Sequence, residues 1–125
     1  MTDYGFKKII AWQRAHAFVL AVYKAGESFP EYEKRGLWSQ FTRAAVSIAA
    51  NIAEGYKKLS KADKLRFINI SQGSLEECRY YIILAHDLQY ISDEIEQELN
   101  YKLEGVSWCL NAYAQAIVND AGIKD

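Results

Sequence analysis

The sequence predicts an all-α protein, an antiparallel up-down-up-down four-helix bundle. Apolar residues recur every three or four positions over four long segments, which is the spacing of helices with one buried face. No segment alternates apolar and polar residues for long enough to predict a strand. The 125 residues include one proline and seven glycines, which lie mostly where the helical repeat lapses. Four such helices joined by short loops pack naturally as a bundle.

The first two helices are expected over residues 8–25 and 37–58. In the first, the apolar repeat consists of Trp12, Ala15, Val19 and Val22. Gly26 and Pro30 then end the helix, because glycine destabilises a helix and proline cannot continue one. In the second, one stripe of the helical wheel contains Leu37, Phe41, Ala44, Ala45, Ile48, Ile52 and Tyr56. We expect this stripe to face the bundle core.

The last two helices are expected over residues 61–88 and 93–120. Ser60 precedes the third helix, and Asp63 follows three residues later in the arrangement of a capping box. Ser92 precedes the fourth helix, and acidic residues follow it, which suits the positive end of a helix dipole. The apolar repeats include Leu65, Ile68, Leu75, Ile82 and Ala85 in the third helix and Ile95, Leu99, Val106, Leu110, Tyr113 and Ile117 in the fourth.

Length and composition favour a single domain over residues 1–125. Hydrophobic residues make up 50% of the chain, charged residues 25%, and the formal net charge is −1, which indicates neither disorder nor a strongly basic nucleic-acid module. The longest apolar run, residues 17–23, is far shorter than the ~20 residues that span a bilayer. Cys78 and Cys109 lie far apart and in no metal-binding motif. We therefore expect a soluble cytoplasmic protein with reduced thiols and no membrane partner.

The helix over residues 37–58 has too little charged surface for a helix on the outside of a bundle. Beside its core stripe runs a polar ladder of Gln40, Arg43, Ser47, Asn51 and Glu54. The remaining arc contains mostly small or apolar residues, among them Ala49 and Ala53. Such an arc is normally buried, and a second subunit is its simplest cover. Alternatively, the alanines are exposed and are present because alanine favours helices.

The third helix adds to this expectation. Beside its core repeat lies a second apolar file of Phe67, Ile70, Tyr81 and Leu84. Small residues nearby would let a neighbouring backbone approach; they are Ser71, Gly73 and Ser74. We expect a homo-oligomer in which the small, apolar arc of residues 37–58 meets another copy of the chain.

The polar ladder is the one constellation in which chemistry could be concealed. Its side chains could line a small-molecule pocket, although no substrate is evident. The other interpretation is that they pair across helices or subunits, with Arg43 bound by Glu76 or Glu77. Arg43 and Glu54 are about three turns apart and cannot touch within one helix. A pair between these two residues would therefore involve another chain.

Basic residues crowd the turn between the second and third helices. This cluster, here called the basic tip, consists of Lys57, Lys58, Lys61, Lys64 and Arg66. In a ring of subunits it would form a basic collar able to bind the phosphates of RNA or DNA through counterion release. The alternative is a solvated tip, since the cluster lacks interleaved exposed aromatic residues on which bases could stack.

Motifs of enzyme chemistry are missing from the sequence. A di-iron bundle needs Glu-x-x-His on two helices, but the residues three before His16 and His86 are Gln13 and Ile83. Each histidine is therefore interpreted as an ordinary polar side chain. No phosphate-binding glycine loop, nucleophile elbow or zinc-protease motif occurs. Cys78 lies in the core register of its helix, which indicates a packed thiol. We expect no catalytic, metal or cofactor site.

Residues 38–55 carry a recognisable signature. This segment reads WSQFTRAAVSIAANIAEG and closely resembles the signature of the four-helix-bundle family of 23S ribosomal RNA intervening-sequence proteins. Further similar segments are Trp12-Gln13-x-Ala15, Val22-Tyr23, Phe29-Pro30, Gly36-Leu37 and Gln72-Gly73-Ser74-Leu75-x-Glu77. The resemblance spans about residues 6–118, which is nearly the whole chain.

The resemblance implies an antiparallel four-helix bundle that assembles into a ring, most often a homopentamer, and it implies no known activity. Members are encoded within insertions of ribosomal RNA genes or elsewhere in bacterial genomes. A related branch, the accessory protein of diversity-generating retroelements, resembles a basic pentameric barrel that binds nucleic acid. The balanced charge of this chain departs from that branch. We therefore expect a non-enzymatic homo-oligomeric scaffold, with a nucleic-acid-binding accessory protein as the alternative.

Overall fold

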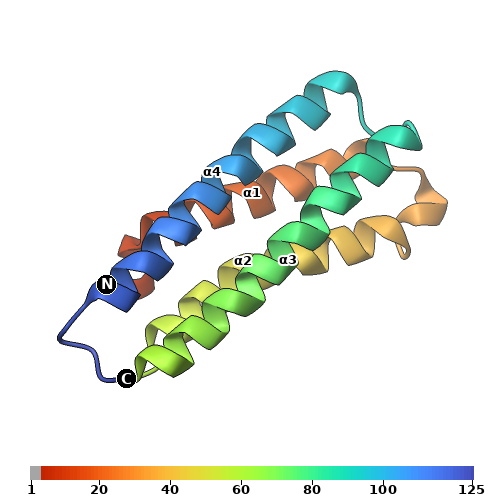
Figure 1. Ribbon diagram of the computed structural model, residues 1–125. Coiled ribbons are helices and arrows are strands. Elements are labelled where there is room, and N and C mark those ends of the chain that lie inside the picture. Colours follow the sequence, from red (N-terminus) through yellow and green to blue (C-terminus); the bar gives the residue numbers. More distant parts are fainter. Residues whose placement is uncertain (1–3) are drawn as a thin grey trace.

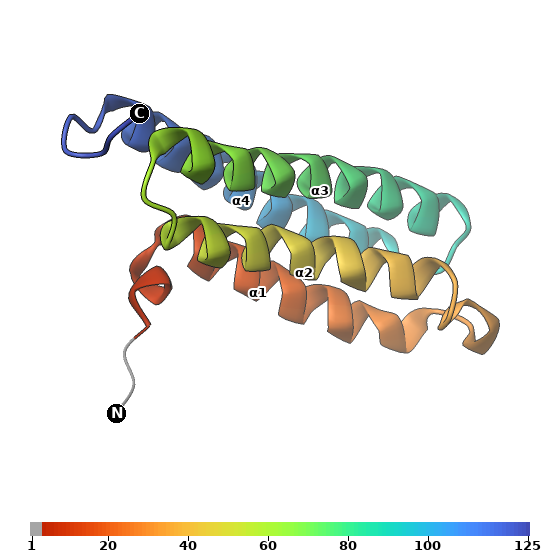
Figure 2. The same ribbon diagram turned by 90° about the horizontal axis from the view of Figure 1, so that it is seen from below.

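The computed structural model describes residues 4–125 and is a bundle of four antiparallel helices (Figure 1). They are α1 (Ile10–Ala25), α2 (Leu37–Tyr56), α3 (Lys61–Asp87) and α4 (Asp93–Asn119). Each helix packs against two neighbours, so that α2 lies between α1 and α3, and α4 closes the bundle between α3 and α1. Figure 2 shows the four helices side by side along one axis. The predicted all-α, up-down-up-down fold is therefore confirmed.

The core is formed by the apolar stripes that the helical repeat predicts. Its largest fully buried side chains include Phe18, Phe41, Ile48, Ile52, Ile82, Leu99, Leu103 and Leu110. The rings of Phe18 and Phe41 join α1 to α2, with their centroids 6.3 Å apart. Tyr56, which the repeat places in the same stripe, is exposed at the end of α2. A helix end at the rim of the bundle has fewer neighbours to cover such a side chain.

The helix ends follow local chemistry; two of them differ by two residues from the expected ranges, and the ends of α3 and α4 differ by one. The Ser60 hydroxyl accepts a hydrogen bond from the Asp63 amide (3.1 Å), and Ser92 accepts one from the Ile95 amide (3.2 Å). Both serines cap their helices in this way. At the other end of the chain, Gly5–Lys8 form a separate 3₁₀ turn, and α1 begins only at Ile10. Helix α2 ends at Tyr56, two residues before the expected boundary.

The turn between α3 and α4 closes tightly without a glycine. Gln89 adopts a left-handed backbone conformation with φ of 64°. The Tyr90 amide donates to the Ala85 carbonyl (2.8 Å), and the Gln89 amide donates to the His86 carbonyl (2.9 Å), which satisfies carbonyls at the end of α3. The Tyr90 hydroxyl then donates to Glu33 (2.9 Å) in the connection between α1 and α2. Both connections at this end of the bundle are therefore tied together.

Within residues 4–125, no helix has both the length and the apolar character required to cross a membrane.

Candidate functional site

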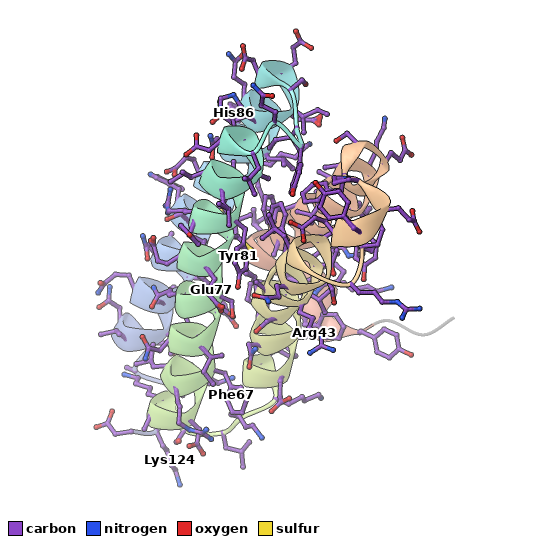
Figure 3. The ribbon with its side chains drawn as sticks, turned by 90° about the vertical axis from the view of Figure 1, so that its right-hand side faces the viewer. Arg43, Phe67, Glu77, Tyr81, His86 and Lys124 are labelled. Atoms are coloured by element: carbon purple, nitrogen blue, oxygen red, sulfur yellow. The ribbon has the colours of Figure 1, made fainter. Side chains whose placement is uncertain are left out.

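The polar ladder of α2 and the facing side of α3 form an open groove of about 260 Å³, here called the α2–α3 groove. Figure 3 shows Glu77 and Tyr81 along α3 with Arg43 on the neighbouring α2. The remaining lining residues are Gln40, Ala44, Ser47 and Ser74. The groove thus brings together polar residues that lie more than 25 positions apart in the sequence, as expected if ladder residues pair across helices.

Hydrogen bonds fix the floor of the groove. Ser74 donates its hydroxyl hydrogen to Ser47 (2.8 Å), and the Tyr81 hydroxyl lies within reach of Gln40 (3.3 Å) and Glu77 (3.4 Å). Burial raises the pKa of Tyr81, and the negative charge of Glu77 raises it further. Tyr81 therefore remains a hydrogen-bond donor at neutral pH. Asn51 instead bonds within its own helix, to the carbonyl of Ser47 (2.9 Å) and to its hydroxyl (3.0 Å).

The two charged members of the ladder lie at the surface of α2. Within residues 4–125, neither Arg43 nor Glu54 forms a hydrogen bond or ion pair through its side chain, and both are exposed. The expected pair between Arg43 and a carboxylate of α3 does not form. Glu77 lines the same groove without bonding Arg43, and Glu76 pairs with Arg79 (3.2 Å). Cross-helix pairing is therefore seen for Gln40 and Ser47, whereas Asn51 bonds within α2. Arg43 has no partner among residues 4–125.

The small, apolar arc of α2 is narrower than its sequence indicates. Thr42 and Ala49 are covered by the chain's own bundle, and Ala49 is only 8% exposed. Val46 is 41% exposed, Ala50 is exposed and Ala53 is half-buried. Because α1 and α3 flank α2 on both sides, solvent reaches only the strip opposite the core. We call Val46, Ala50 and Ala53 the α2 strip; Arg43 and Glu54 lie at its two ends.

The second apolar file of α3 serves mainly the chain itself. Phe67 is buried against α2, where a Cβ added to Gly55 would lie 2.9 Å from the Phe67 Cβ. Ser71 is fully buried and donates to the Ile48 carbonyl (2.9 Å). Of the three small residues expected to admit a neighbouring backbone, Ser71 and Ser74 meet α2 of the same chain, whereas Gly73 faces open space. Ile70, in contrast, remains 42% exposed.

The basic tip is partly used for intramolecular contacts. Lys61 donates to the Val118 carbonyl at the end of α4 (2.9 Å), and Lys64 donates to the Tyr56 carbonyl at the end of α2 (2.7 Å). Burial lowers the pKa of Lys64. Cations near the negative end of a helix dipole are stabilising. These two lysines therefore hold helix ends.

The other cations of the tip lie over aromatic rings or in solvent. Lys58 and Arg66 lie over the Phe67 ring, 5.0 and 4.7 Å from its centroid, and Arg66 also approaches Asp63 at 3.9 Å. Lys57 is exposed. The chain's C-terminal segment adds Lys124, whose carbonyl accepts from the Lys61 amide (2.7 Å). Figure 3 shows Lys124 at the same end of the bundle as Phe67.

The sequence reasoning missed a polar cluster around His86. This residue lies in the last turn of α3, and its Nε2 is 2.7 Å from Asp93 and its Nδ1 3.3 Å from Glu96. Both carboxylates belong to the first turns of α4. The hydrogen bond with Asp93 has the largest effect and raises the pKa of His86; burial opposes it, and the negative charge of Glu96 raises the pKa again by a smaller amount. The acidic start of α4 was visible in the sequence, but the turn that brings it to His86 was not.

The two thiols differ in their surroundings. Cys78 is fully buried in the core, as predicted, and burial raises the pKa of its thiol well above the ordinary range. A thiol in this environment stays protonated and is a poor nucleophile. Cys109 is half-buried on α4 and unpaired. His16, the second histidine, stacks on Trp12 with the ring centroids 5.0 Å apart.

One known protein family matches the part of the chain that contains the helices of the groove. Residues 7–112 match the family described as 23S rRNA-intervening sequence protein. This range contains all of α2 and α3, and the description names no catalytic activity. A search of curated proteins found no match to the chain. Because the family match covers most of the sequence and the fold is a four-helix bundle, the chain belongs to the family of 23S rRNA-intervening sequence proteins.

Proposed function

We propose that the chain is a non-enzymatic scaffold of the cytoplasm that assembles with further copies of itself, with the pentamer as the assembly implied by the family resemblance. The observation that carries this proposal is the α2 strip. Its exposed centre is small and apolar, and its two ends carry opposite charges that have no partner among residues 4–125. A surface of this kind is suited to close contact with another helix.

The charges at the ends of the strip favour a protein partner over solvent alone. Arg43 and Glu54 are separated by eleven residues, or about 16 Å along the helix, so they cannot pair within α2. A second copy of the chain presents the same two charges. A contact between copies can therefore bring a carboxylate to Arg43 and a guanidinium to Glu54, which fixes orientation as well as adding attraction.

The polar groove beside the strip would complete such an interface. Its charged groups at the surface, the Arg43 guanidinium and the second oxygen of the Glu77 carboxylate, can bond to an approaching chain. Interfaces commonly combine an apolar centre with a polar rim of this kind. The uncharged bonds on the floor of the groove, such as Ser47 to Ser74, would stay in place.

The mass of the protein in solution tests the assembly. Light scattering on a sizing column is expected to give several times the 14.3 kDa of one chain, and about five times for the pentamer. The mass should be the same at low and at moderate salt concentration, because the centre of the α2 strip is apolar. A stable 14.3 kDa monomer at micromolar concentration would overturn the proposed scaffold.

A second candidate function, nucleic-acid binding, is favoured by the placement of Lys124. The C-terminal segment brings this residue to the basic tip, where Lys57 is also exposed. In an oligomer each chain would add the same cations to a shared surface. Phosphate binding of this kind is electrostatic and insensitive to sequence. The intramolecular bonds of Lys61 and Lys64 leave fewer cations for it than the sequence indicates.

Salt-dependent RNA binding tests this second candidate. If the tip binds phosphates, a fluorescent single-stranded RNA should bind at low salt and dissociate steeply as salt rises. Replacing Lys57 and Lys124 by Gln should make the negative slope of log K against log salt shallower by about 1.4, because each phosphate contact with a single strand contributes about 0.7. The matched control replaces Lys24 and Lys102, which lie away from the tip, and should leave the slope unchanged. Equal effects of the two double variants, or no RNA binding, would exclude the tip as a nucleic-acid site.

A further inference from the structure

We propose that His86, Asp93 and Glu96 form a binding site for a divalent transition-metal ion of the Zn²⁺ class at the junction of α3 and α4. Each residue offers one ligand atom, and these atoms all lie within 4.8 Å of one another. The site is separate from the α2–α3 groove and the basic tip, so it does not depend on the scaffold function.

The fold holds the three side chains in place from both sides of the turn. His86 occupies the last turn of α3, where its carbonyl accepts from the Gln89 amide. The Ser92 cap starts α4, so that Asp93 and Glu96, three residues apart, lie on the same face of its first turns. The hydrogen bond of Tyr90 to Glu33 anchors the turn to the connection between α1 and α2. The ligand atoms are thus positioned by two rigid helices.

The donor set suits zinc better than magnesium or calcium. An imidazole nitrogen and two carboxylate oxygens are ordinary zinc ligands, whereas the hard cations prefer oxygen ligands alone. The site can be reached from solvent, because the His86 and Glu96 side chains are 31% and 27% exposed and that of Asp93 is 82% exposed. Three protein ligands leave room for water to complete the coordination.

The surrounding charge also favours a cation. Between residues 80 and 101 the chain has five acidic residues and neither lysine nor arginine. Among the basic residues nearby, Arg79 pairs with Glu76 and Glu104, and Lys24 of α1 lines a pocket with Glu98. The excess negative charge at the site therefore comes from Asp87, Asp93, Glu94 and Glu96. The His86 ring itself now bonds both carboxylates. A metal ion would replace the hydrogen on one ring nitrogen, and the carboxylate that now bonds the other nitrogen would turn from the ring to the ion.

Calorimetric titration with Zn²⁺ alone tests the site. The probe is ZnCl₂ added to the untagged chain of 125 residues after removal of metals with a chelator. We expect one Zn²⁺ per chain and a rise in melting temperature, because a ligand that binds only the folded state stabilises it. Both His86→Gln and Asp93→Asn should weaken binding at least tenfold. Mg²⁺ at the same concentration should neither bind nor raise the melting temperature.

Two control variants distinguish this site from other side chains that could bind Zn²⁺. His16→Gln should bind Zn²⁺ as the unaltered chain does, since His16 stacks on Trp12 at another part of the bundle. Cys109→Ser should also keep binding, which excludes the half-buried thiol as the ligand. Far-UV circular dichroism verifies that each variant is folded. Unchanged binding by His86→Gln, loss of binding in Cys109→Ser, or no Zn²⁺ bound by the unaltered chain would each overturn the proposal.

Discussion

Replacing Phe41 by Ala is expected to lower the free energy of unfolding by about 3–5 kcal/mol. Phe41 is fully buried, and its ring contacts Phe18 of α1 and Tyr81 of α3, with centroid distances of 6.3 and 6.0 Å. The ring therefore joins three helices at one point of the core. Removing it forfeits the burial of an aromatic side chain and leaves a cavity that rigid helices cannot close.

Urea unfolding followed by circular dichroism measures this loss. A domain of this size is stable by about 5–15 kcal/mol, so the variant should unfold at a much lower urea concentration or be partly unfolded without urea. Both proteins are compared at one chain concentration, because assembly adds to apparent stability.

Tyr101→Ala provides the matched aromatic control for Phe41→Ala. Tyr101 is 80% exposed on α4, and its loss should change the free energy of unfolding by less than about 0.5 kcal/mol. Equal losses for the two variants would show that Phe41 is not at the centre of the core.

The fold could be predicted because its main determinants are local. The stripe of α2 that includes Leu37, Phe41 and Ile48 is buried as its helical period indicates. The serine caps at residues 60 and 92 mark helix starts to within one residue. Periodicity and capping act over a few residues, so both can be recognised in the sequence. The boundary at α1 was less accurate because Gly5–Lys8 continue the helical pattern as a 3₁₀ turn.

The candidate surfaces were harder to predict because they depend on neighbours distant in sequence. A helical wheel gives the direction in which Ala49 and Ala50 project, but not where α1 and α3 lie around α2. The sequence showed a cluster of lysines at the basic tip, but not that Lys61 would reach the end of α4 or that Lys64 would reach the end of α2. In each case the contact is set by packing, which the local pattern does not encode.

The His86 cluster shows the same limit for a small site. Its three residues are spaced by seven and three positions across a turn, a pattern that matches no helical metal motif. In the turn that forms this contact, Gln89 adopts a left-handed backbone conformation. Glycine or asparagine at this position would have indicated such a conformation in the sequence, but glutamine does not. A search for acidic helix starts that follow a histidine across a short turn would have found it.

Two adjacent substitutions in α2 should have different effects, which separates folding from assembly. Ala49→Glu places a carboxylate in the chain's own core, where Ala49 is 8% exposed. An unpaired buried charge costs about 3–5 kcal/mol, so this variant should lose helical signal or unfold at much lower urea concentration. Ala50→Glu places the same carboxylate on the exposed α2 strip. Its monomer should keep its helical signal, since glutamate is a good helix former.

Ala50→Glu should have its largest effect on the association of chains. If the α2 strip is covered by another copy, the carboxylate must be buried at the contact or the contact must open. A penalty of about 3 kcal/mol weakens association more than a hundredfold, which should reduce the mass in light scattering to that of one chain. Ala116→Glu, on the exposed side of α4, is the matched control and should leave the mass unchanged. A folded Ala50→Glu protein with the mass of the unaltered assembly would place the contact between copies elsewhere, because no neighbour could then lie against the centre of the strip.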